Sequence, residues 1–228
     1  MHAPDLRYEV KFTAPEAYLP KLRAGLRLHP MAFRRLHPPR WINNLYLDSQ
    51  DFTRLNQNYA GISERCKVRL RWYGETLSPV RGTVEFKLKR DQLGWKRHYP
   101  VAREFDLRSG NWSAFLVDLG RELPPEARVQ MQNLTWPVLI NRYHREYYAT
   151  PDRLIRLTVD CGQKFYGQWD RMWPNLRFST QPLELLVVEV KAPSHASARV
   201  RSAVQALPLL RSKNSKYVSG TERLLGLR

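Results

Sequence analysis

Several short segments of the chain alternate apolar and charged residues with a period of two. Segment 7–12 reads RYEVKF, so Tyr8, Val10 and Phe12 share one side of an extended chain and the three charged residues share the other. The same alternation recurs in segments 67–72, 84–89, 156–160 and 188–191. Period-two alternation is typical of a β-strand with one apolar and one polar face. These segments therefore predict an antiparallel sheet.

The charged faces of these strands carry almost only Lys, Arg and Glu, whereas a solvated face usually also carries Thr, Ser and Gln. Lys67, Arg69 and Arg71 follow one another on one face. Successive residues of one face are about 7 Å apart, so these cations repel unless an anion compensates them. A flat solvated sheet is one interpretation, and a charged concave surface or barrel interior is the other. The repulsion favours the second.

The apolar faces need a cover, and four segments read as helices that can provide it. These segments are 15–28, in which Pro20 delays or breaks the start, 52–59, 112–122, and 194–207 with Ser194 as N-cap. The prolines near 37–39, 124–125 and 174 predict loops. The pattern as a whole predicts an α+β fold in which charged strand faces lie inside and helices outside.

Composition adds a strong charge asymmetry to this picture. The 228 residues carry 38 Lys and Arg against 21 Asp and Glu, a net charge of +17. The cations are spread along the chain, which implies a folded domain with a polyanionic partner: nucleic acid, phosphate ligands or an anionic membrane surface. No linker or repeat divides the chain, so we expect a single domain, 1–228. No apolar run reaches the ~18 residues of a membrane helix, and we expect a cytoplasmic protein.

Eight segments resemble, in order, the motifs of the VTC domain, the polyphosphate-polymerase domain of the triphosphate tunnel metalloenzyme (CYTH-like) superfamily. The segments are RYEVKF, NNLYLDS, CKVRLRWYG, VEFKLKR, NRYHREYY, RLTVD, VVEVK and SKY, between residues 7 and 217. Each short motif is weak alone, and the ordered set is specific. The resemblance implies an eight-stranded antiparallel β tunnel, or barrel, with a charged interior, helices packed outside, and a triphosphate or polyphosphate chain within.

The resemblance also implies roles for individual residues. Those expected to act on the phosphate chain during catalysis are Lys11, Arg69, Arg71, Lys87, Arg156 and Lys216. Those expected to bind substrate beside them are Arg7, Lys67, Lys89, Lys96, Arg97, Arg142, Arg145 and Lys191. The motif NRYHRE leaves open whether Arg142 or Arg145 faces the tunnel. Arg makes forked contacts with phosphate oxygens and Lys supplies point charge, which agrees with these roles.

A Mn²⁺ or Mg²⁺ cofactor is implied as well, because hard oxygen ligands suit these ions. Glu189 is the principal candidate ligand, and Glu9, Glu85 and Asp160 either bind metal or orient neighbouring cations. Milder interpretations stay open at this stage. In the first, Glu189 and Lys191 form only a surface pair. In the second, Asp160 only closes a turn, and in the third, segment 67–71 is an exposed basic ridge. Lys216 lies in a Ser/Asn-rich loop, and its role rests on the resemblance alone.

The leading functional hypothesis is therefore metal-dependent phosphoryl transfer, in which a polyphosphate polymerase-like enzyme lengthens polyphosphate with the γ-phosphate of ATP or another triphosphate. Transfer to water instead would make the protein a triphosphatase or tripolyphosphatase. A non-catalytic receptor for polyphosphate or inositol phosphates is another alternative. Nucleic-acid binding is disfavoured, because glutamates share faces with the cations and no RNP, KH or zinc-finger motif occurs.

Overall fold

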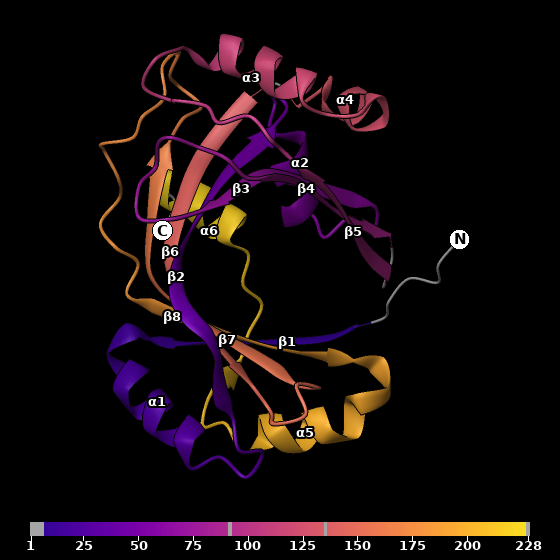
Figure 1. Ribbon diagram of the computed structural model, residues 1–228, viewed down its shortest axis with the longest axis vertical. Coiled ribbons are helices and arrows are strands. Elements are labelled where there is room, and N and C mark those ends of the chain that lie inside the picture. Colours follow the sequence, from indigo (N-terminus) through magenta and orange to yellow (C-terminus); the bar gives the residue numbers. More distant parts are fainter. Residues whose placement is uncertain (1–6, 91–92, 135, 227–228) are drawn as a thin grey trace. The chain divides into compact units, whose positions relative to one another are not determined.

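The computed structural model describes residues 7–90, 93–134 and 136–226, with only the backbone for Arg7, Arg90 and Leu93. Within these ranges the protein is an α+β structure built on one antiparallel sheet (Figure 1). Its strands are β1 (Arg7–Pro15), β2 (Arg34–Asp48), β3 (Arg65–Tyr73), β4 (Thr83–Arg90), β5 (Leu93–Pro100), β6 (Trp136–Ala149), β7 (Arg156–Gly167), β8 (Leu185–Pro193) and β9 (Leu210–Arg211). Each segment predicted from period-two alternation is a strand or part of one.

The expected eight-stranded closed barrel is wrong in two respects for the described residues. The sheet has nine strands, in the order β5-β4-β3-β2-β6-β7-β8-β1-β9, and β5 and β9 are its two ends. The ninth strand pairs only Leu210 and Arg211 with β1, so it is too short to show period-two alternation in the sequence. The sheet is not closed, because its two end strands do not pair with each other.

The chain folds into two compact units, and each unit is made of three separate stretches of sequence. Unit 1 contains residues 1–41, 143–163 and 182–215, and unit 2 contains residues 42–142, 164–181 and 216–228. Each unit has its own apolar core. Because neither unit is a continuous segment of chain, no linker separates them in the sequence. The prediction of a single domain stays a prediction.

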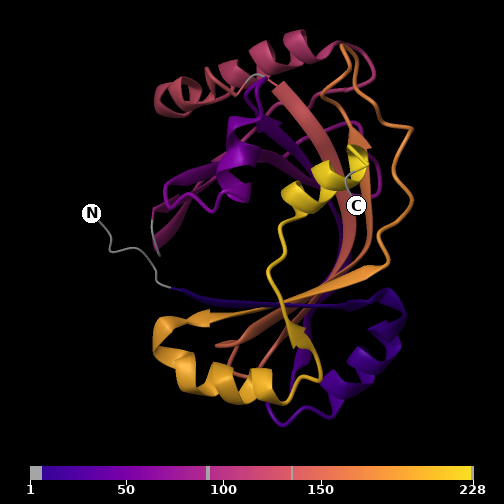
Figure 2. The same cartoon turned by 180° about the vertical axis from the view of Figure 1, so that it is seen from behind.

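Unit 1 buries the apolar faces of β1, β7 and β8 beneath two helices, α1 (Leu19–Arg27) and α5 (Ser197–Gln205), which lie on the same side of these strands (Figures 1 and 2). Val10, Phe12 and Val188 belong to this core, as the alternation predicts. Pro20 stands in the first turn of α1, where a missing N–H costs nothing, so it starts the helix and does not break it.

Unit 2 buries the apolar faces of its strands beneath α3 (Trp112–Arg121) and α4 (Pro125–Met131), which run along one side of these strands (Figure 1). Val68, Leu70 and Phe86 lie in this core. The short helix α2 (Thr53–Tyr59) follows β2, and α6 (Lys216–Leu224), yellow in Figure 2, lies on the side of the strands away from α3 and α4.

Some local expectations are corrected. Ser194 is not an N-cap, because it lies inside a 3₁₀ turn, Ser194–Ala196, that begins directly after the extended Pro193. The prolines at 37–39 lie in β2 and not in a loop; the pairing of β2 with β3 starts only at Ile42, so these prolines interrupt no hydrogen bond with β3. Pro124 and Pro125 begin α4, in the N-terminal positions that tolerate proline. Lys216 is the first residue of helix α6 and not part of a loop.

Candidate functional site

The charged face of unit 1 is built from strands β1 and β8, which place opposite charges directly across from each other. Glu9 pairs in register with Lys191, and Lys11 pairs with Glu189. The Nζ atom of Lys191 donates to Glu189 at 2.6 Å, and the Nζ atom of Lys11 lies 3.3 Å from Glu9 and 3.6 Å from Glu189. Two carboxylates and two ammonium groups therefore form one compact cluster, with Lys11 and Lys191 each in contact with both acids.

Glu189 is the most buried member of this cluster, with 11% of its side chain exposed. Burial alone raises the pKa of a carboxyl group, but the charges of Lys191 and Lys11, together with the neighbouring Glu9 and Arg145, hold the pKa of Glu189 well below its ordinary value. Burial lowers the pKa of Lys11, and the charges of Glu189 and Glu9 outweigh it, so that this pKa is raised. Both groups are therefore charged at neutral pH.

Strands β6 and β7 add a second ion pair to the charged face of unit 1. Arg145 donates through Nε and Nη2 to the two oxygens of Asp160, at 2.5 and 2.7 Å. Asp160 is 1% exposed, so this forked pair is withdrawn from solvent. Arg142 is three residues before Arg145 in β6, and strand alternation puts it on the opposite side of the strand. The ambiguity between these two arginines is resolved in favour of Arg145 for the charged face.

The charged face of unit 2 centres on Glu85 in β4. Arg69 donates to Glu85 through Nε at 2.7 Å and Nη2 at 2.5 Å, and Arg71 Nη1 lies 3.5 Å from the same carboxylate. Burial raises the pKa of Glu85, but the two guanidinium charges outweigh it and lower the pKa below its ordinary value. The predicted phosphate-binding arginines are thus held in place by a carboxylate on the neighbouring strand.

Three lysines lie side by side across strands β3, β4 and β5 on this same face. Lys67 stands opposite Lys87 in the register of β3 and β4, and Lys87 stands opposite Lys96 in the register of β4 and β5. Like charges placed directly opposite each other on a sheet are destabilising. An anion that bridges them therefore gains from all three charges at once. Sequence alternation placed Lys67 and Lys87 on the charged faces of their own strands, and Lys96 was expected from the family resemblance. Only the register reveals that the three form a row.

The remaining predicted residues divide by face. Lys89 lies opposite Arg65 on the charged face of unit 2, and Arg156 lies opposite Lys191 on that of unit 1. Arg97 lies opposite Phe86, which belongs to the apolar core, and is therefore on the other face from Lys96. Arg7 opens β1, but its side chain lies outside the described atoms.

Helix α6 reaches the charged face of unit 2 through residues that sequence reasoning missed. Tyr217 stacks on Tyr46, with ring centroids 5.1 Å apart, and the hydroxyl of Tyr46 accepts from Arg69 Nη1 at 3.4 Å. The hydroxyl of Tyr217 donates to the buried Asp48 at 2.6 Å. These contacts bring Lys216, the first residue of α6, to the side of the strands that carries Arg69.

A further missed residue is Asn44, whose Oδ1 accepts from Arg71 Nε at 2.8 Å. The sequence did contain a signal for it: in β2, Asn44, Tyr46 and Asp48 alternate with apolar Leu45 and Leu47. This is the same period-two pattern as in the charged strands, but two of its three polar residues, Asn44 and Tyr46, are uncharged. Its polar members position the arginines and α6.

The carboxylates can be tested for their fitness to hold a divalent metal ion. Among residues 7–90, 93–134 and 136–226, no three acidic, histidine or cysteine side chains are grouped as a complete metal site. Asp160 and Glu85 are engaged by arginines. Glu9 and Glu189 are adjacent, and Thr158, in register with Glu189, has a buried Oγ1 without a hydrogen-bond partner among the described residues. Since Mg²⁺ usually takes one or two carboxylates plus substrate phosphates, Glu9 and Glu189 fit.

The fold and its charged faces define a class of α+β proteins in which each unit carries basic and acidic side chains on one face of its strands and an apolar core on the other. Within that class, the chain belongs to the VTC domain family: the family model matches residues 6–225, nearly the whole chain. The resemblance drawn from the ordered strand motifs is thereby confirmed.

Solved structures support the fold. A protein from Pyrococcus horikoshii matches with a TM-score of 0.50 and 13% identity, over 97% of this chain and 99% of that one. A candidate adenylate cyclase from Vibrio parahaemolyticus matches with a TM-score of 0.52 and 12% identity, over 95% and 99%. At such identities the likeness concerns the fold alone. No curated protein matches the chain. None of the helices in the described ranges has the length and apolar character needed to cross a membrane.

Proposed function

We propose that this protein transfers the γ-phosphoryl group of a nucleoside triphosphate such as ATP to a polyphosphate chain, with a divalent metal ion. The observation that carries the proposal is the row of Lys67, Lys87 and Lys96 beside Arg69 and Arg71 on one sheet face. Five cations within one set of neighbouring strands suit a ligand that carries several negative charges along its length. Membership of the VTC domain family supports the same substrate class.

The reaction places few demands on covalent chemistry. The bond between the γ-phosphorus and its bridging oxygen to the β-phosphate breaks, a terminal oxygen of the chain bonds to that phosphorus, and the nucleoside diphosphate leaves. Catalysis then consists of positioning the reactants and stabilising charge on phosphate oxygens. Arg71, held by Asn44 and 13% exposed, and Arg69, held by Glu85, are preorganised donors for this purpose.

The carboxylates of unit 1 would hold the metal ion. We expect this ion to be Mn²⁺ or Mg²⁺, because both prefer hard oxygen ligands. When bound, such an ion supplies positive charge to phosphate oxygens. Glu9 and Glu189 provide hard oxygen ligands, and the charges of Lys191 and Lys11 keep Glu189 ionised. The same cations, with Arg145 kept in place by Asp160, limit the repulsion between the two carboxylates.

The test is incubation of the purified protein with ATP and Mn²⁺ or Mg²⁺, while nucleoside diphosphate, free phosphate and chain length are followed together. Diphosphate with lengthening chains supports the proposal. Diphosphate with free phosphate and no chains identifies a triphosphatase, and binding without turnover identifies a receptor; either result contradicts polyphosphate synthesis.

Two variants separate binding from chemistry. Arg71→Ala removes a charge-assisted phosphate contact, worth about 1.5 to 3 kcal/mol, so polyphosphate affinity and turnover should each fall at least tenfold. Arg97→Ala, on the opposite face of β5, is the matched control and should change both little. If the two variants behave alike, the assignment of the charged face as the phosphate site is wrong.

Glu189→Gln weakens metal coordination with almost no change in shape. It should spare or strengthen polyphosphate binding, because a negative charge is removed, while metal-dependent turnover collapses. Glu184→Gln, an exposed carboxylate shortly before β8, is the control. Retention of near wild-type metal-dependent turnover in Glu189→Gln would overturn its role as the principal ligand.

A further inference from the structure

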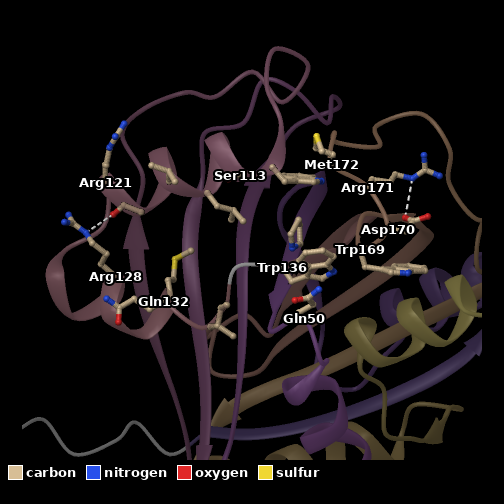
Figure 3. Close-up of a pocket in the computed structure, with 17 residues that line it drawn as sticks. Gln50, Ser113, Arg121, Arg128, Gln132, Trp136, Trp169, Asp170, Arg171 and Met172 are labelled. Atoms are coloured by element: carbon tan, nitrogen blue, oxygen red, sulfur yellow. Dashed lines mark hydrogen bonds and ion pairs between the residues drawn. The ribbon is translucent and has the colours of Figure 1, made fainter.

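A pocket of about 910 Å³ lies in unit 2 among α3, α4, the start of β6 and the segment 169–172. None of the residues predicted for phosphate or metal binding lines it. Its walls are mostly apolar, with aromatic and sulfur-containing side chains contributed by Trp112, Met131, Trp136, Trp169 and Met172. In Figure 3, Trp136 and Trp169 lie close together on one side, and Arg121, Arg128 and Gln132 lie on the other. The volume is within the range of small-molecule sites, roughly 300 to 1,000 Å³.

The charges around the pocket favour an anion. Its lining includes Arg121, Arg128 and Arg171 but only one carboxylate, Asp170. Arg128 donates to the backbone oxygens of Gly120 and Leu123, which fixes its side chain at the end of α3. Arg171 Nε lies 3.5 Å from Asp170, as the dashed line in Figure 3 marks, and Arg121 Nη1 donates to Asp118 at 2.8 Å. Arg128 has no carboxylate partner among the described residues, so its positive charge is available to an anion at the pocket.

A glycine helps to keep the pocket open. Gly120 lies in α3, and a Cβ atom placed on it would meet nothing within 4 Å. Glycine within a helix is destabilising relative to alanine, so the sequence retains a residue that the helix itself does not favour. The missing side chain leaves room where a larger residue would project into the pocket.

We propose that this pocket binds an amphipathic organic anion, with an apolar chain or ring system among the tryptophans and an acidic group near Arg128. The proposal concerns a second site and does not depend on phosphoryl transfer.

The probe is 8-anilinonaphthalene-1-sulfonate, an aromatic anion whose fluorescence rises in an apolar environment, titrated into the full chain. Gly120→Phe fills the pocket and should weaken binding at least about tenfold, the effect of losing 1.4 kcal/mol. Gly25→Phe is the matched control, because Gly25 is also a helical glycine with nothing within 4 Å of its Cβ position but lies in α1 of unit 1. It should bind the probe as the wild type does.

Competition tests the chemical class. Dodecanoate should displace the probe, and dodecylammonium at the same concentration should displace it far less. Arg128→Gln, which leaves the apolar walls intact, should reduce this preference for the anion. Equal binding by wild type and Gly120→Phe, absence of saturable binding, or equal displacement by both amphiphiles would overturn the proposal. Circular dichroism of each variant establishes that a loss of binding does not reflect unfolding.

Discussion

The carboxylate of Glu85 holds two arginines in unit 2, and its environment gives a prediction about pH. A carboxyl group whose pKa is lower in the folded than in the unfolded state stabilises the fold at pH values above its unfolded pKa. That stability is lost as the pH falls through the folded pKa. The pKa of Glu85 is lowered from 4.5, so its contribution should be complete at pH 7 and should decline below about pH 4.5.

Glu85→Gln should therefore lower the free energy of unfolding at pH 7 by about 1 to 3 kcal/mol, because buried guanidinium groups lose their charged acceptor. The difference from wild type should shrink as the pH falls below about 4.5, because the unfolded chain then takes up a proton at Glu85. Urea unfolding at stepped pH measures both values, with Glu104→Gln as an exposed control. A difference that stays constant from pH 7 to pH 3 would contradict this account of Glu85.

Among the secondary-structure elements, helix α6 is held by one buried carboxylate. Asp48 accepts from the backbone N–H groups of Ser49, Arg54 and Leu55, and from the hydroxyl of Tyr217. The same side chain thus fixes the end of β2, the first turn of α2 and the first turn of α6. Burial and the charge of Asp48 raise the pKa of Tyr217, so its hydroxyl stays protonated and remains a donor.

Tyr217→Phe should lower the free energy of unfolding by about 1.5 to 3 kcal/mol, since a hydrogen bond to a charged group is lost while the ring and its stacking on Tyr46 remain. Chemical denaturation measures the change. Tyr18→Phe, at a partly buried position of unit 1, is the control and should cost much less. Equal effects of the two variants would mean that Asp48 does not hold α6 through this bond.

For the protein as a whole, the net charge of +17 makes stability depend on anions. Phosphate ligands that bind only the folded state raise its stability by RT ln(1 + [L]/Kd), about 2.7 kcal/mol at a hundredfold excess over Kd. Polyphosphate and triphosphate should therefore raise the melting temperature clearly. Chloride at equal ionic strength should raise the melting temperature far less, because single chloride ions screen the charges but do not bridge the three lysines of the row.

Differential scanning fluorimetry measures this effect. A melting temperature that does not change with polyphosphate, or that rises equally with chloride, would contradict a specific polyanion site on the charged faces. Arg71→Ala should reduce the shift caused by polyphosphate, and Arg97→Ala should not.

Local sequence patterns were enough to predict which side chains share a face. Period-two alternation depends only on the geometry of an extended chain, and so Lys11 groups with Glu9, and Arg69 with Arg71, from the order of residues alone. The same rule identified the apolar faces that form the two cores. The locations of α1, α2, α3 and α5 were also predictable, because their apolar spacing is local. Helices α4 and α6 were missed, since short segments that begin with prolines or follow a polar stretch resemble loops.

The assembly of these faces depends on contacts between distant parts of the chain, which local patterns do not reveal. Strand register brings Lys67, Lys87 and Lys96 into one row, and turns Glu85 into the partner of two arginines on the next strand. The pairing of Asp48 with Tyr217 joins residues 169 positions apart. The pocket beside α3 arises from packing between separate segments, and no local pattern indicates it. Periodicity fixes the direction of a side chain along its own strand, whereas its neighbours are fixed by hydrogen bonds and packing between strands distant in sequence.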